Sequence, residues 1–225
     1  MKKLISFFLA AALLLAVLPV GLPASAAETV DFTDVPTGSW YELAVRWALE
    51  NGITAGVGNG QFGPNQIVTR GQVVTMLWRL EKAPDPAGTA AFSDVTEGQW
   101  YGKAVLWAAE NQIVAGYPSG VFAPNRAISR QELVTILFRY AKFLDSGLAA
   151  PNQDLSIYTD AGDLFGYALE PMRWAVANGI VSGTSSNTLS PKGTANRAQL
   201  VQMLYRWLAK PDNGSGWDLP YIPAP

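Results

Sequence analysis

The stretch Thr69-Arg70-Gly71-Gln72 shows how this chain is organised, because it opens a mostly apolar run with helical spacing and then returns twice. Its counterparts are Ser129-Arg130-Gln131-Glu132 and Asn196-Arg197-Ala198-Gln199. Thr, Ser and Asn cap helix N-termini by accepting a hydrogen bond from an otherwise unpaired backbone N–H. Gln or Glu three residues later completes a capping box in the first two copies, and the third copy approximates one. The pattern predicts three helices, each beginning just after its cap.

The arginine of each copy is placed where it does not help a helix. Arg70, Arg130 and Arg197 fall at the first helical position, where the helix dipole presents partial positive charge and a cation costs roughly 0.3–1 kcal/mol. The same choice in three copies suggests a role other than helix stability. A helix N-terminus combined with a guanidinium group can bind a carboxylate or a phosphate.

Composition excludes several classes of site. The 225 residues include no His and no Cys, so Cys nucleophiles, His general bases, His/Cys metal sites and disulfides are ruled out. Hydrophobic residues make up 49% of the chain and charged residues 15%, which predicts a packed core rather than disorder. We expect no cofactor and no metal.

The first 26 residues have the features of a signal peptide. Lys2-Lys3 forms a basic start, residues 4–20 are mostly apolar, and Ala24-Ser25-Ala26 offers small residues for cleavage. A membrane anchor is the alternative, but the apolar run is short for a spanning helix. We expect cleavage after Ala26, a secreted protein and no transmembrane segment in the mature chain.

The charge balance argues against a nucleic-acid partner. Removing Lys2 and Lys3 from the 16 basic residues leaves 14 against 18 acidic ones, a net charge of −4. An acidic protein does not bind a polyanion by bulk electrostatics, so any such attraction must come from local arginines.

Internal repetition accounts for most of the remaining chain. Phe32-Thr33-Asp34-Val35 matches Phe92-Ser93-Asp94-Val95 at an offset of 60 residues, and Tyr158-Thr159-Asp160-Ala161 is a looser third copy. A single repeat of about 50 residues would be marginally stable, so the three are expected to form one domain. We divide the chain into a signal peptide (1–26), three repeats (31–81, 91–143 and 157–209) and a Pro/Gly-rich tail (210–225).

Within each repeat we predict a short extended segment, a helix, a Gly/Pro-rich loop and a second helix. In copy one the first helix should span about residues 39–50 and end at Asn51-Gly52, where a left-handed conformation is tolerated. Copy two has Asn111-Gln112, so Asn111 is expected to be left-handed there. The loops lack the Lys-Ser/Thr of a P-loop and also lack carboxylates for calcium. They are typical of tight turns around a buried Phe or Leu.

The second helices are apolar around most of their circumference. In copy one the polar stripe consists of Gln72, Thr75 and Arg79. The aligned residues form the same stripe in the other copies: Glu132, Thr135, Arg139, Gln199, Gln202 and Arg206. A helix this apolar packs on two sides. Three such helices satisfy one another best as a central bundle with the first helices outside, so the predicted fold class is all-α.

Taken together, these motifs resemble the S-layer homology (SLH) family. The matching features are F-x-D-V, W-Y-x-x-A-V-x-W-A, N-G-I-T-A-G, G-x-F-x-P-N and T-R-x-Q/E, in order and with looser agreement in copy three. The resemblance implies a pseudo-threefold, three-pronged α-helical spindle with a central bundle of the second helices. It also implies non-covalent attachment to the bacterial cell wall.

The implied ligand is a secondary cell-wall polysaccharide or a peptidoglycan-linked glycan. In this family the contact often involves a pyruvylated sugar, whose ketal carries a carboxylate, in grooves between the prongs. By motif, the implied carbohydrate-binding residues are the carboxylate ligands Arg70, Arg130 and Arg197, the hydroxyl acceptors Asp34, Asp94 and Asp160, and the stacking residues Trp40 and Trp100. Copy three departs from the pattern, because Tyr167 takes the Trp position and Pro171 enters the first helix. The third groove is therefore the weakest candidate.

Each assignment has a structural alternative. Arg70 can instead pair with Asp34, and the aspartates can simply shape the turn before the first helix. Trp40 and Trp100 can belong to the core, as the mid-helix tryptophans are expected to: Trp47, Trp107 and Trp174. If the arginines are ligands, replacing Arg70 or Arg130 by Ala should weaken wall binding and leave the fold intact.

The sequence favours a non-catalytic anchor. A glycan-cleaving enzyme needs two carboxylates at a defined separation, and although Glu50 and Glu110 match across copies, position 177 is Ala. The alternative is a structural surface-layer subunit or an adaptor that acts through protein contacts, with surface-layer proteins as partners.

Overall fold

The computed structural model describes residues 32–88 and 92–209, so the predicted signal peptide (1–26) and tail (210–225) lie outside the described residues. The described part contains α-helices, one 3₁₀ turn and isolated β-bridges but no strand, which confirms the all-α class. The elements are α1 (Glu42–Glu50), α2 (Arg70–Leu80), α3 (Gly102–Glu110), α4 (Arg130–Leu144), η1 (Ala161–Asp163), α5 (Gly166–Ala177) and α6 (Arg197–Leu208). The spindle outline implied by the resemblance stays a prediction.

The three second helices begin where the sequence predicts. The side chains of Thr69, Ser129 and Asn196 each accept a hydrogen bond from the backbone N–H three residues later, and the side chain at that position accepts one in return. All three are complete capping boxes, because the side-chain oxygen of Gln accepts the cap N–H as that of Glu does.

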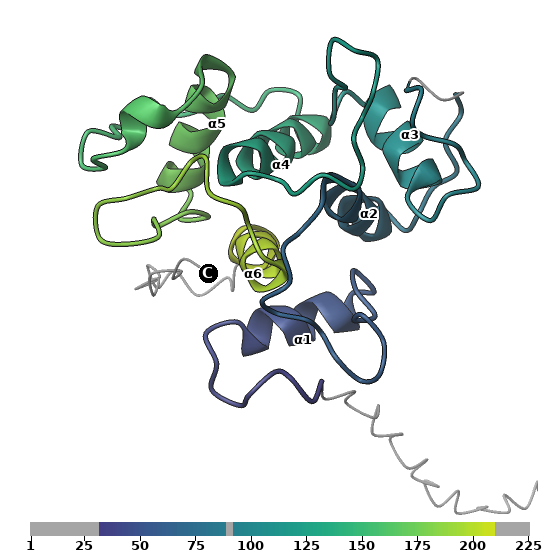
Figure 1. Ribbon diagram of the computed structural model, residues 1–225. Coiled ribbons are helices and arrows are strands. Elements are labelled where there is room, and N and C mark those ends of the chain that lie inside the picture. Colours follow the sequence, from purple (N-terminus) through teal and green to yellow (C-terminus); the bar gives the residue numbers. More distant parts are fainter. Residues whose placement is uncertain (1–31, 89–91, 210–225) are drawn as a thin grey trace, which may run out of the picture. The chain divides into compact units, whose positions relative to one another are not determined.

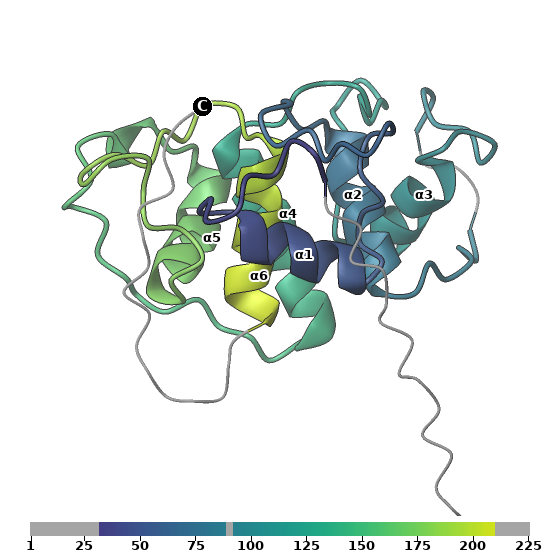
Figure 2. The same ribbon diagram turned by 90° about the horizontal axis from the view of Figure 1, so that it is seen from below.

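The helices pair between repeats rather than within them. The second helix of each repeat packs on the first helix of the next, which gives the pairs α2 with α3, α4 with α5, and α6 with α1. Figures 1 and 2 show these pairs, with α2, α4 and α6 towards the middle in Figure 1. The apolar circumference of the second helices is consistent with this pairing, because each of them packs on a helix outside its own repeat.

A closed ring of backbone hydrogen bonds joins the repeats just before the second helices. Val68 N–H donates to Ala195 C=O at 2.9 Å, Ala195 N–H to Ile128 C=O at 3.2 Å, and Ile128 N–H to Val68 C=O at 3.0 Å. All three residues are buried. Each repeat therefore donates one of these hydrogen bonds and accepts another, and the ring closes only when three repeats are present.

The Gly/Pro-rich loops enclose the side chains that the sequence predicts. Phe62, Phe122 and Leu189 are all fully buried. Phe62 packs against Phe32 with ring centroids 5.8 Å apart, and Phe122 packs against Phe92 at 5.4 Å. The loops thus hold an apolar side chain over the opening motif of their own repeat.

The end of α3 differs from the prediction. Asn111 has φ −88° and Gln112, the next residue, has φ +58°. The expectation of a left-handed Asn111 is therefore wrong. The reason is that Asn111 continues the last helical turn, because its backbone N–H and its Nδ2 both donate to Trp107 C=O, at 3.2 and 2.8 Å. Asn51 and Asn178 make the same bond, and each is followed by a glycine with positive φ.

Repeat 3 begins its first helix earlier than the other repeats, and this places Pro171 inside the helix. Position 169 aligns with the first residues of α1 and α3, whereas α5 already begins at Gly166. Pro171 lies inside α5 and is buried. At the aligned positions of α1 and α3 it would fall in the first turn, where a missing N–H costs little.

The core tryptophans are placed largely as expected. Trp107 and Trp174 are buried, whereas Trp47 is half-buried and packs edge-on against Tyr205 with ring centroids 5.9 Å apart.

Candidate ligand-binding grooves between the repeats

The three repeated arginines link neighbouring repeats. Their Nε atoms donate to backbone carbonyl groups of the next repeat: Arg70 to Phe122 at 2.9 Å, Arg130 to Leu189 at 2.8 Å and Arg197 to Phe62 at 2.8 Å. The side chains are buried, with exposed fractions of 6%, 1% and 4%. Burial lowers the pKa of all three. The pKa of Arg130 falls to about 10, which still leaves it charged at neutral pH.

The helix N-termini are already occupied by protein. In α2 the N–H of Arg70 donates to Arg126 C=O at 3.1 Å and that of Gly71 to Pro124 C=O at 2.8 Å. The first two N–H groups of α4 and α6 donate in the same way to the next repeat. The first N–H groups are therefore not available to a ligand, and any anion must be recognised by side chains.

The repeated aspartates hold the loops of their own repeats. Asp34 accepts hydrogen bonds from Phe62 N–H at 2.7 Å and Gly63 N–H at 2.8 Å. Asp94 and Asp160 accept the equivalent pairs, from Phe122 and Ala123 and from Leu189 and Ser190. The peptide of Phe62 thus bonds Asp34 through its N–H, and the carbonyl of the same residue bonds Arg197. This link replaces the suggested pairing of Asp34 with Arg70.

One groove, which we call groove A, takes residues from all three repeats and has a volume of about 440 Å³. The polar stripe of α2 lines it with Gln72, Thr75 and Arg79, repeat 2 adds Trp100, and repeat 3 adds Arg197. The other lining residues are Thr54, Gly56, Val57 and Met76. Trp100 is 59% exposed and Arg79 is also exposed. Groove A thus combines two cations with an aromatic face and has no carboxylate among its lining residues.

A second groove, groove B, repeats this arrangement one repeat further along the chain, with a volume of about 210 Å³. The stripe of α4 lines it, Tyr167 takes the place of Trp100, and Arg70 takes the place of Arg197. The lining residues are Arg70, Val114, Ala115, Gly116, Tyr117, Glu132, Thr135, Ile136, Arg139 and Tyr167. Apart from Ala115, each aligns with a residue of groove A.

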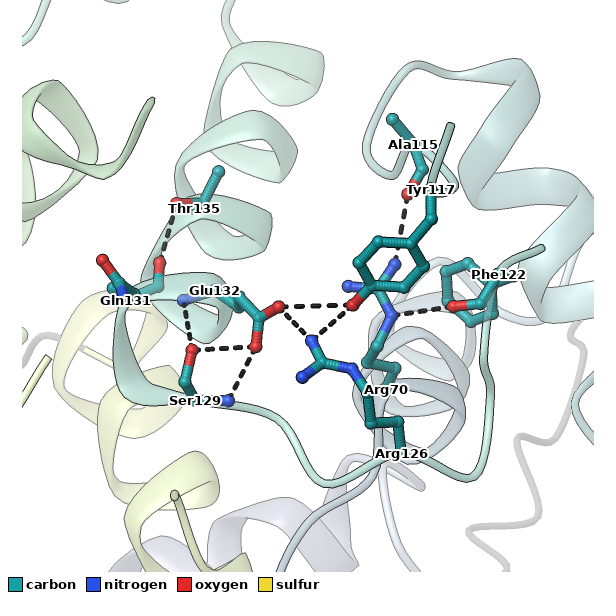
Figure 3. A network of polar contacts seen from close by, with 9 residues as sticks. All are labelled: Arg70, Ala115, Tyr117, Phe122, Arg126, Ser129, Gln131, Glu132 and Thr135. Carbon is teal, nitrogen blue, oxygen red and sulfur yellow. Dashed lines mark hydrogen bonds and ion pairs between the residues drawn. The ribbon is translucent and has the colours of Figure 1, made fainter. Parts of the chain in front are cut away.

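A polar network crosses groove B (Figure 3). The Glu132 carboxylate accepts hydrogen bonds from the Arg126 guanidinium and, at 3.3 Å, from the Tyr117 hydroxyl. The Tyr117 ring lies over the Arg70 guanidinium at 5.0 Å. Burial of Glu132 opposes ionisation, but hydrogen bonds from Ser129 and the charge of Arg126 outweigh it and lower its pKa.

The stripe of α6 lies at the third junction between repeats, and there the residues that align with those of grooves A and B are buried. Gln199 and Arg206 correspond to Gln72 and Arg79, but their exposed fractions are 0% and 3%. Arg130, which corresponds to Arg197 and Arg70, is 1% exposed.

The predicted site residues are therefore divided among different places. Arg197 and Trp100 line groove A, and Arg70 lines groove B. Asp34 and Asp94 line two other hollows, of about 520 and 410 Å³. Trp40 is half-buried against the core and contacts Tyr41 with ring centroids 5.0 Å apart. Arg130 and Asp160 line neither groove A nor groove B.

The sequence interpretation missed three residues that line each groove, those of the polar stripe of its second helix. From sequence, the polar stripe of the second helices serves only to define their apolar circumference, yet it lines both grooves. Its repetition at three- and four-residue spacing on an otherwise apolar helix was a signal that could have identified it.

Two other observations concern the part of the chain that the structure describes. It holds no group of three or more acidic side chains suited to a metal ion. None of its helices combines the length and apolar character needed to cross a bilayer.

Three known proteins with different names contain a region similar to this chain. The exoglucanase XynX of Acetivibrio thermocellus is 29% identical over 83% of this chain, and the surface-layer 125 kDa protein of Lysinibacillus sphaericus is 29% identical over 88%. The cellulosome-anchoring protein of A. thermocellus is 27% identical over 75%. The aligned regions span only 17%, 16% and 38% of these relatives, respectively.

The S-layer homology domain matches residues 31–74, 91–134 and 158–201. The three matched segments are the three repeats identified from the sequence, and at 44 residues each they make up more than half of the 225-residue chain. The chain therefore belongs to the S-layer homology domain family.

Proposed function

We propose that this protein is a non-catalytic module that attaches to the cell wall by binding a secondary cell-wall polysaccharide in grooves A and B. The observation that carries the proposal is the duplication of one site. Each groove brings together arginines from two repeats and an exposed aromatic ring from the third. An active site is usually single, whereas a site that recurs along a chain is suited to a repeating polymer.

The side chains suit a sugar that carries a carboxylate, such as a pyruvate ketal. Arg79 can donate charge-assisted hydrogen bonds to the carboxylate and Arg139 can donate them to sugar hydroxyl groups, while Trp100 or Tyr167 can cover an apolar sugar face. One such contact contributes about 1.5–3 kcal/mol. Two grooves on one polymer raise the overall affinity through effective concentration.

The relatives support attachment rather than catalysis. The aligned region is a minor part of an exoglucanase, a cellulosome-anchoring protein and a surface-layer protein. Proteins named for such different roles share this region, and attachment at the cell surface is a role that can serve all three. In addition, groove A has no carboxylate lining it and groove B has only Glu132, so neither contains an acidic pair for glycan cleavage.

Co-sedimentation with purified cell walls tests the proposal, before and after the accessory polysaccharide is stripped from them. We expect binding that disappears on stripping. Binding that survives would indicate peptidoglycan or a surface-layer protein as the partner, and the carboxylate would no longer be the ligand.

Arg79→Gln and Arg139→Gln test the grooves themselves. Each variant should weaken wall binding by about 10-fold or more, because a charge-assisted hydrogen bond is lost. Arg46→Gln is the matched control, since Arg46 is half-exposed, pairs with Glu42 on the same helix and lines neither groove. Equal binding by all three variants would contradict the assignment of the grooves.

A further inference from the structure

Grooves A and B have the same plan but differ at positions that govern charge and access. Val57 of groove A aligns with Tyr117 of groove B, and Gln72 aligns with Glu132. A third difference lies beside the groove, where Gln66 aligns with Arg126. Groove A is thus formed with neutral residues at the three positions that make the polar network of groove B.

In groove B these three residues act together. The Tyr117 ring contacts two guanidinium groups, with Arg70 at 5.0 Å and Arg126 at 5.3 Å from its centroid. Its hydroxyl contacts both Glu132 and Arg126. Tyr117 is therefore held over Arg70. The carboxylate of Glu132 accepts the hydrogen bond that Arg126 would otherwise offer to a ligand.

In groove A the equivalent positions place neither a carboxylate nor a tyrosine beside the cations, and Arg79 is exposed to a ligand. Gln72 is neutral, and its Oε1 accepts the Thr69 N–H of the capping box at 3.0 Å. Val57 is 40% exposed and has no hydroxyl group that could form a hydrogen bond to hold its side chain over an arginine. The volume of groove A is about 440 Å³, against about 210 Å³ for groove B.

We infer that anionic sugars bind in groove A, and that Tyr117 and Glu132 exclude them from groove B. The inference rests on the proposed function and adds which groove takes the charged residue of the polymer. A ligand carboxylate in groove B would face the like charge of Glu132 and would have to displace Tyr117 from Arg70. Groove B is left for an uncharged part of the same polymer.

The chain itself supplies matched residues for the test. Tyr117→Val/Glu132→Gln gives groove B the residues that groove A has at these two positions, and Gln72 and Gln199 show that Gln serves in this capping box. Val57→Tyr/Gln66→Arg/Gln72→Glu makes the opposite change in groove A. Circular dichroism and thermal melting confirm that each variant is folded.

Isothermal titration with a methyl hexopyranoside bearing a 4,6-linked pyruvate ketal gives the stoichiometry. Its methyl ester is the uncharged control. We expect one equivalent bound by the natural chain, about two by the opened groove B variant, and at least 10-fold weaker binding by the closed groove A variant. The ester should show none of these differences.

Two results would overturn the inference alone. One is two equivalents bound by the natural chain, and the other is a single equivalent that Tyr117→Val/Glu132→Gln does not increase. If no variant binds the ketal while wall co-sedimentation persists, the carboxylate ligand of the proposed function fails, and the inference fails with it.

Discussion

Arg70, Arg130 and Arg197 each extend a side chain out of their own repeat and into the next. The bonds they form there are to backbone carbonyl groups in buried surroundings, where a hydrogen bond to a charged group is strong and its loss is costly. For Arg70 and Arg197 the same guanidinium also borders a groove. One residue therefore serves both stability and recognition, and removing it changes both.

The first prediction concerns these buried bonds. Arg70→Ala or Arg130→Ala should destabilise the protein by about 2–4 kcal/mol, because a buried carbonyl loses its charged donor. Urea unfolding measures the change, with Arg46→Ala as an exposed control that should stay within about 0.5 kcal/mol. The structure thus revises the expectation that these Ala variants leave the fold intact, and unchanged urea midpoints would restore it.

The second prediction concerns Glu132, whose pKa lies below its ordinary value of 4.5. A carboxylate with a lowered folded-state pKa stabilises the protein above the unfolded-state value, and this contribution is lost as pH falls through the folded-state pKa. The natural chain should therefore be more stable than Glu132→Gln at neutral pH, and the difference should shrink below pH 4.5. Urea midpoints measured from neutral pH downwards test this. A difference that does not depend on pH would mean that ionisation of Glu132 is not its source.

At the scale of elements, local patterns predicted the helix starts well and the helix ends less well. A capping box depends on residues only three apart, so Thr69, Ser129 and Asn196 identified their helices from sequence alone. The end of α3 depends on whether the Asn111 side chain or its backbone satisfies the last turn. Both donate to Trp107 C=O, so Asn111 keeps a helical φ and the left-handed conformation falls on Gln112.

The third prediction follows from this left-handed glutamine. Gln112→Gly should stabilise the protein by about 0.5–1 kcal/mol, because relief of the left-handed strain exceeds the extra unfolded-state entropy of glycine. Thermal melting is the measurement. Gln112 is exposed, so no packing is lost. A lower melting temperature would show that the Gln112 side chain makes a favourable contribution that outweighs the strain.

The fourth prediction concerns the first glycine of the loop, which all three repeats retain. A Cβ on Gly56 would lie 2.3 Å from Gln61 O and 2.6 Å from the Phe32 ring, at a φ of +83°. Gly56→Ala should destabilise the protein by about 2–4 kcal/mol, because overpacking adds to backbone strain. Gly60→Ala is the control, since its φ of +67° is also positive but nothing lies within 4 Å. Equal losses in the two variants would rule out the close approach as the cause.

At the scale of the whole molecule, the repeats depend on one another in a cycle. The ring through Val68, Ile128 and Ala195, the helix pairs and the arginine bonds all run from one repeat to another. Each groove likewise takes residues from all three repeats. Stability and the candidate sites are therefore properties of the set of three.

The fifth prediction is that two repeats do not fold cooperatively when the third is deleted. Deleting residues 157–209 removes α5 and α6, the partners of α4 and α1, and also the carbonyl that Arg130 binds. The remaining two repeats should lack a cooperative thermal transition and elute in size-exclusion chromatography as an expanded or aggregated species. A sharp transition at the midpoint of the full chain would show that two repeats suffice.

The sequence by itself determined the features that depend on near neighbours. These are the three repeats, the capped second helices, the all-α class and the buried loop residues Phe62, Phe122 and Leu189. It also identified the family, because the motifs recur in order.

The tertiary structure alone decided which repeat each residue serves. Arg70 belongs by sequence to repeat 1 but borders a groove formed by α4, and Trp100 of repeat 2 borders the groove of α2. Periodicity reports which face of a helix is polar, not which neighbour that face meets. The partner is set by packing between segments far apart in the chain, and so only the fold shows that the polar stripes line the grooves.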